Sequence, residues 1–316
     1  MTTASATATT TKGPRLNAIR FRPRASLALA VTSLVGVVGF GWPLLIPSHA
    51  NANLAHATDA PWIFIALLPL LLAVLLAEIS EGSLDAKAVA LLGILAACGA
   101  ALRIPSPGIA GFEPVFFLLI PAGRVLGRGF GFVLGAVTIL ASALITGGVG
   151  PWLPFQMVAA AWMGFGAGCL PRAGGKRELL ILAAYGVVSS LIYGALLNLW
   201  FWPFGAGTTT SFSFVPGAPV LHNLHSFVFF DLTTSLGFDI PRAVTTAVLV
   251  LVLGHPVLAA LRRATRRAAF DAPVTFEGAQ PAPAAGAAGA AGVGAGAREH
   301  TGETGETSAP LGQPQP

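Results

Sequence analysis

The chain has 316 residues, of which 54% are hydrophobic and only 10% are charged. A water-soluble globular protein of this length rarely has this balance, so the composition favours a chain embedded in lipid. The net charge is +5, but the cations gather beside apolar blocks, which indicates membrane anchoring and argues against a nucleic-acid-binding face. Cys98 and Cys169 both lie in apolar runs, so no disulfide framework is expected.

Both ends of the chain have compositions that do not support a packed core. Residues 1–24 are rich in Thr and Ala and then basic, and residues 271–316 are rich in Ala, Gly and Pro. Such segments cannot bury enough apolar surface to offset the entropy lost on ordering. We expect both to be disordered tails.

Eight apolar blocks lie between these tails, at about 26–46, 61–77, 88–104, 113–126, 129–147, 154–170, 179–200 and 240–261. Most can cross a hydrocarbon core of about 30 Å, which takes about 20 helical residues. The sequence therefore predicts an all-α integral membrane protein. The fourth block is short and contains Pro121, so by length alone it could be a re-entrant segment.

The distribution of Lys and Arg decides between spanning and turning back. If all eight blocks span, one side receives every cationic cluster, namely Lys12 to Arg24, Lys87, Arg124 with Arg128, Arg172 with Lys176 and Arg177, and Arg262 to Arg267. The loops of the opposite side, 47–60, 105–112, 148–153 and 201–239, contain no Lys or Arg. The positive-inside bias thus predicts eight spans, with both termini cytoplasmic.

The first block also has some features of a signal peptide. A basic stretch precedes it, and it ends near Ser48-His49-Ala50, a small-x-small cleavage pattern. The apolar run is longer than the usual 7–15 residues of a signal peptide, so we expect a retained helix.

Glycine-rich stretches in this chain lack the context of a nucleotide-binding loop. Gly131 and Gly135, like Gly164 and Gly168, are four residues apart in apolar blocks, where small residues let helix backbones approach closely. No G-x-x-x-x-G-K-[ST] motif occurs, so a transporter driven by ATP would need a separate ATPase.

The third block has alanines four residues apart. Ala96 with Ala100, or Ala97 with Ala101, could serve internal packing or dock another protein.

Candidate ligand-binding residues gather on the side without Lys or Arg. Trp152 lies in a Gly/Pro-shaped loop, and Gln156 follows it as a neutral donor and acceptor, which could equally bond a neighbouring helix. Arg103 ends the third block and Glu113 opens the fourth, so an ion pair could hold the loop 105–112; the alternative is two independent interfacial residues.

A long aromatic loop completes this side. Asn198 and Trp200 lead into it, and His222 and His225 lie within it. Aromatic residues at a membrane edge commonly anchor the protein, but so many with polar groups between them also suit a pocket for a flat or bulky ligand. Two histidines alone do not make a zinc site, which needs three or four ligands, so no metal is expected.

Several stretches resemble the substrate-binding membrane subunit, or S component, of energy-coupling factor transporters, the modular vitamin importers of prokaryotes. The resemblance runs from about Ala88 to Leu261. It is carried by Ala-Leu-Arg103, Gly111-Phe-Glu-Pro-Val-Phe-Phe117, Ala122-Gly-Arg-Val-Leu-Gly127, Phe130-Gly-Phe132 and Thr146-Gly-Gly-Val-Gly-Pro-Trp-Leu-Pro-Phe-Gln-Met157. The last stretch is the most specific and is similar to actinobacterial members.

The resemblance implies a six-helix substrate-binding domain at 85–265. The first two blocks form an expected two-helix membrane extension at 25–80 that lies beyond the family pattern, and its role is open. The resemblance implies no enzymatic activity, no cofactor, and a location in the prokaryotic cell membrane. Members capture a vitamin or related nutrient from outside, and a cobalamin-type vitamin is our guess here. They dock onto a membrane coupling (T) subunit through an Ala-xxx-Ala stripe of their own. Two cytoplasmic ATPases then drive inward release.

The candidate substrate-binding residues are thus Arg103, Glu113, Trp152, Gln156, Asn198, Trp200, His222 and His225, and the candidate docking residues are Ala96, Ala97, Ala100 and Ala101. Two other classes of function stay open. A membrane enzyme would use His222, His225, Asp231 and Asp239. A stand-alone secondary transporter usually has ionisable groups at mid-membrane and an inverted repeat, whereas the acidic residues here lie near block ends.

Overall fold

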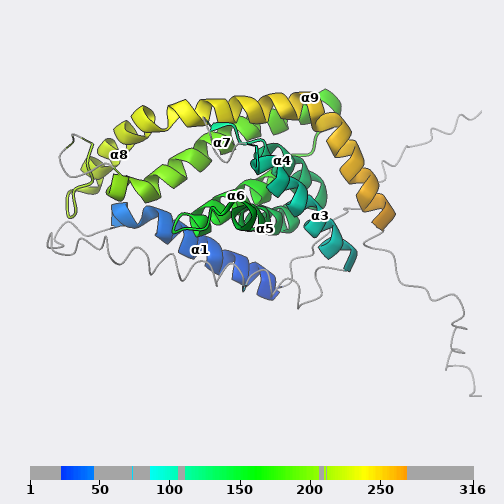
Figure 1. Ribbon diagram of the computed structural model, residues 1–316, viewed down its shortest axis with the longest axis horizontal. Helices are drawn as coiled ribbons and strands as arrows, with labels where there is room; N and C mark the ends of the chain where they lie inside the picture. Colours follow the sequence, from blue (N-terminus) through cyan, green and yellow to red (C-terminus); the bar gives the residue numbers. More distant parts are fainter. Residues whose placement is uncertain are drawn as a thin grey trace, which may run out of the picture. The chain divides into compact units, whose positions relative to one another are not determined.

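The computed structural model describes residues 23–45, 73, 86–105, 111–205, 210 and 212–268, and its regular elements are all α-helices (Figure 1). They are α1 (Pro23–Leu45), α3 (Ala86–Arg103), α4 (Val115–Leu126), α5 (Arg128–Thr146), α6 (Leu153–Cys169), α7 (Gly175–Gly205), α8 (Val220–Thr234) and α9 (Leu236–Ala268). The all-α fold class is therefore confirmed. The expected tails and nearly all of the second apolar block, 61–77, lie outside the described residues.

Among the described residues, five helices are long and apolar enough to cross a bilayer: α1, α3, α5, α7 and α9. This agrees with a multi-pass membrane protein. The fourth and sixth blocks form helices of 12 and 17 residues, which extend only about 18 and 26 Å. By length and composition, five helices therefore fit the expected spans, and the count of eight stays a prediction.

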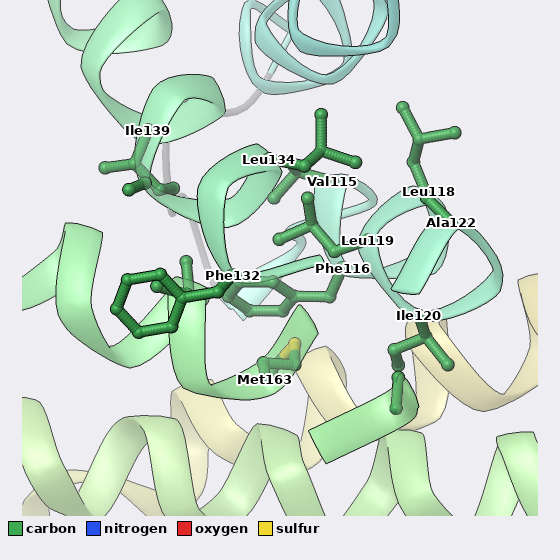
Figure 2. Packing of buried hydrophobic residues seen from close by; sticks show 14 of the residues in the cluster. Val115, Phe116, Leu118, Leu119, Ile120, Ala122, Phe132, Leu134, Ile139 and Met163 are labelled. Atoms are coloured by element: carbon green, nitrogen blue, oxygen red, sulfur yellow. The ribbon is translucent and has the colours of Figure 1, made fainter. Parts of the chain in front are cut away.

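The short helix α4 lies in the middle of the bundle and packs on α5, α6 and α9. Ten of its residues are buried, from Val115 to Gly123 and at Leu126. A helix that is apolar on every side must be covered on every side, and here other helices provide the cover. Figure 2 shows Phe116 and Leu119 of α4 near Phe132 of α5 and Met163 of α6. A short span and a re-entrant segment both need such cover by protein, so the burial of α4 fits either one.

Glycines bring the backbones of α4, α5 and α6 together. A Cβ atom added to Gly131 would collide with the carbonyl of Gly164, and one added to Gly135 would collide with the carbonyl of Ala160. Gly123 of α4 also faces the Gly164 carbonyl. Helix packing, the role expected for the glycine pairs, is confirmed.

The first helix belongs to the same core as the later ones. Phe40 of α1 is 2% exposed and contacts Phe155 edge-on, with ring centroids 5.0 Å apart. Ser33 accepts a hydrogen bond of 3.1 Å from the indole nitrogen of Trp162. Because these contacts reach α6, α1 packs as part of the bundle.

One helix was not expected. The sequence predicts a loop at 201–239, but α7 continues to Gly205, α8 covers Val220–Thr234 and α9 begins at Leu236. The Asn223 side chain accepts from the Val215 amide at 3.1 Å and donates to its carbonyl at 2.9 Å, which fixes the preceding segment to α8. The sequence does not predict α8, because its His and Asp residues interrupt the apolar pattern.

Candidate functional site: a buried cluster of opposite charges

Four charged side chains meet where α3 ends and where α4 and α9 begin, and we call them the Glu113 cluster: Arg103, Glu113, Asp239 and Arg242. Glu113 is 4% exposed and accepts a hydrogen bond of 2.5 Å from Arg242 Nε. Arg242 Nη1 donates to Asp239, whose other oxygen accepts from the Ser235 hydroxyl at 2.5 Å. Arg103 Nη2 lies 3.8 Å from Glu113 Oε1.

Local sequence explains how these groups come together. Asp239 and Arg242 are three residues apart in the first turns of α9, so they share one face of that helix. Gly111 has a φ of 74°, and a Cβ there would collide with the backbone of Phe238, so glycine allows the segment before Glu113 to approach α9. Gly194 of α7 leaves space for the Asp239 carboxylate in the same way.

Two buried donors at this cluster have no hydrogen-bond partner among the described residues: Arg103 Nε and the Tyr193 hydroxyl. Tyr193 is 2% exposed, and its ring lies 5.2 Å from the Arg242 guanidinium carbon. A buried donor without a partner is costly, so these groups suit an acceptor supplied by a ligand or an ordered water. Two guanidinium groups and two carboxylates balance in charge, which favours a neutral acceptor such as a carbonyl oxygen over an added anion.

A second cluster, the Glu178 cluster, lies where α7 begins and where α4 and α9 end. Glu178 is 2% exposed and accepts from Arg124 Nε at 2.9 Å and from Arg262 Nη2 at 2.7 Å. Arg124 also donates to the Leu170 carbonyl at 2.8 Å, just after α6. The Glu178 carboxylate therefore joins the ends of α4, α7 and α9, and Arg124 adds the end of α6.

The other predicted binding residues have varied surroundings. Trp200 is buried and stacks on Phe155 at 5.2 Å, beside the half-buried Gln156. Asn198 donates to Asp231 at 2.9 Å and to Thr234 at 3.3 Å, which ties α7 to α8. Trp152 is 43% exposed and donates to the Gly148 carbonyl at 3.2 Å.

His222 and His225 are exposed on α8. Within the described ranges, no three His, Cys, Asp or Glu side chains are grouped so that they could hold a metal ion. Asp231 accepts a hydrogen bond from Asn198, and Asp239 accepts hydrogen bonds from Arg242 and Ser235. Burial raises the pKa of the Asp231 carboxyl, the hydrogen bond from Asn198 opposes this rise, and the nearby Asp239 charge adds to it.

The small residues of α3 divide between two faces. Ala96 and Ala100 are buried, and Gly99 beside them faces Thr138 of α5, so this face serves internal packing. The burial of Ala96 and Ala100 favours the internal-packing alternative for this pair. Ala97 and Ala101 are exposed, and they keep the docking prediction open.

Sequence reasoning found Arg103 and Glu113, and the structure brings them together, but it missed Arg242, the closer partner of Glu113. Tyr193 was missed as well. The available signal was the spacing of Asp239 and Arg242, since an Asp and an Arg three residues apart at the start of a long apolar block predict an internal pair.

Comparison of the chain with protein-family models, with curated proteins and with solved structures finds no match. In the part of the chain that the structure describes, the regular elements are all helices, several of them of bilayer length, and a buried, charge-balanced cluster lies between helix ends.

Proposed function

We propose that this chain is the substrate-capturing membrane subunit of an energy-coupling factor importer. It takes up a vitamin or related small organic nutrient from outside and releases it inward when a membrane coupling subunit and two ATPases act on it. In this proposal the Glu113 cluster lies toward the outside, because the loops at that end contain no Lys or Arg.

The observation that carries the proposal is the pair of buried donors, Arg103 Nε and Tyr193 Oη, beside the Glu113–Arg242 ion pair. Ionisable side chains between membrane helices are costly, and they are commonly kept where they serve a transported ligand. The ion pair holds the helix ends in position, which leaves the two donors to orient a guest.

The resemblance of the Thr146–Met157 stretch to S components supports the same class of function and suggests a vitamin. A cobalamin-type ligand would suit the neutral acceptor argued above, since its side chains carry amide oxygens.

The direct test is native mass spectrometry of the purified chain followed by identification of the released small molecule. We expect the wild type to carry an organic nutrient, and Arg103→Gln to lose at least tenfold of its occupancy while remaining folded. Val248→Ala, on the exposed face of α9, is the matched control. An empty wild-type chain after growth in rich medium, or full occupancy in Arg103→Gln, would count against the proposal.

A stand-alone secondary transporter is a second candidate, and one observation favours it: Glu113 and Asp239 are both buried beside cations that could exchange partners. This alternative predicts uptake without any ATPase and loss of uptake when the proton gradient is collapsed.

A further inference from the structure

Exposed cations gather at the end of the bundle that holds the Glu178 cluster. We call them the basic patch: Lys176 and Arg177 in the first turn of α7, and Arg263, Arg266 and Arg267 in the last turns of α9. The bond of 2.7 Å between Arg262 and Glu178 brings these two helix ends together. The patch therefore combines residues almost ninety positions apart in the chain.

Nothing acidic within these two segments is free to neutralise the patch. In residues 171–180 and 254–268, the only acidic residue is Glu178, which is buried and already bonded to Arg124 and Arg262. A second anion must come from elsewhere.

The depth of the patch follows from the apolar run before it. No Asp, Glu, Lys or Arg lies between Arg242 and Arg262, so the patch follows the long apolar part of a candidate span. Pro256 lies in this run and α9 bends toward its C-terminal end (Figure 1). Cations that directly follow an apolar span commonly lie at the level of the lipid headgroups.

From this geometry we infer that the basic patch binds the phosphate of an anionic phospholipid. Arg263 lies one helical turn before Arg266 and Arg267, and the Arg262–Glu178 bond brings the α7 end with Lys176 and Arg177 close to them, so several donors can reach the oxygens of one headgroup. The bound lipid would contact both α7 and α9 and stabilise their association beside the Arg262–Glu178 bond. This inference requires only that the helices cross a membrane and does not depend on nutrient transport.

The test uses the purified full chain in neutral detergent, titrated with dioleoyl phosphatidylglycerol or with phosphatidylcholine of the same acyl chains. Bound lipid is counted by native mass spectrometry, and the unfolding temperature is recorded. We expect phosphatidylglycerol to bind more tightly and to raise the unfolding temperature. In R263Q/R266Q its affinity should fall about fivefold for each cation removed, or about 25-fold in all.

Lys87→Gln is the matched control, because it removes a cation from the start of α3, which packs on α4 and α5. It should leave the affinity within about twofold of the wild type. Equal binding of the two lipids, or an unchanged R263Q/R266Q variant, would overturn the inference.

Two competing occupants are separated in the same assay. The C-terminal residues include Glu299, Glu303 and Glu306. If this tail covered the patch, the full chain would show no preference for phosphatidylglycerol and E299Q/E303Q/E306Q would acquire one. If inorganic phosphate at millimolar concentration displaced the lipid completely, the patch would be a free-anion site. Either result contradicts the inference.

Discussion

Single charged residues at membrane depth have the largest consequences in this chain. Glu113 faces two guanidinium groups, but Arg242 bonds it at 2.5 Å whereas Arg103 lies at 3.8 Å. Removing one partner of a buried pair leaves a charge without compensation, which costs far more than the pair contributes. Stability should therefore be more sensitive to loss of the Glu113 charge than to loss of the Arg103 charge.

Glu113→Gln keeps the size of the side chain and removes its charge. We expect the free energy of unfolding to fall by about 3–5 kcal/mol, as measured by denaturation in detergent followed by circular dichroism. Arg103→Gln should cost much less, because its contact with Glu113 is long and its Nε has no partner among the described residues. Equal losses in the two variants would contradict the unequal roles of these residues.

Asp231 allows a test of pH dependence on α8. Burial raises the pKa of this carboxyl above its ordinary value of 3.8, so folding favours its protonated form. The destabilising contribution of the ionised form is absent below pH 3.8 and develops as the pH rises through the folded-state pKa. Asp231→Asn should therefore gain stability relative to the wild type as the pH increases. Thermal melts from pH 3 to pH 7 measure this difference, and a constant difference would exclude the effect.

At the scale of helices, packing depends on where the backbone must come close. Gly131 faces the Gly164 carbonyl at the interface of α5 and α6, whereas a Cβ added to Gly93 of α3 would meet nothing within 4 Å. We expect Gly131→Ala to lower the unfolding free energy by about 1–3 kcal/mol through overpacking. Gly93→Ala should be neutral or stabilising by up to about 1 kcal/mol, because alanine favours a helix. The prediction fails if the two variants melt alike.

Helix α1 offers a second comparison of buried and exposed positions. Phe40→Ala would empty a site that is 2% exposed beside Phe155 and Trp162, and we expect a loss of about 3–5 kcal/mol. Leu34→Ala, at a position 64% exposed on the same helix, should change the stability by less than about 1 kcal/mol. If Phe40→Ala were as mild as Leu34→Ala, α1 would not be part of the core.

Elements were predictable from the sequence where local composition determines them. Long apolar blocks indicated α1, α3, α5, α7 and α9, and glycines four residues apart indicated close packing. Helix α8 was missed because its exposed histidines and Asp231 read as loop residues. Arg242 was missed because it is 129 positions from Glu113, and spacing along one chain does not say which helix ends meet.

For the whole molecule, ion pairs join α4 to α9 at both ends, at Glu113 with Arg242 and through Glu178 with Arg124 and Arg262. This central helix is thus fixed to one neighbour at both ends, while glycines pack it closely on α6. The sequence contains no P-loop, so in the proposed transport cycle separate ATPases supply the energy for release.

The most direct measurement is nutrient accumulation in cells that express this chain together with a coupling subunit and two ATPases, fed a defined vitamin mixture and analysed by mass spectrometry. The account predicts that one vitamin accumulates, that accumulation requires both this chain and active ATPases, and that Arg103→Gln abolishes it. Accumulation by this chain alone that stops when the proton gradient is collapsed, or no accumulation of any component, would contradict it.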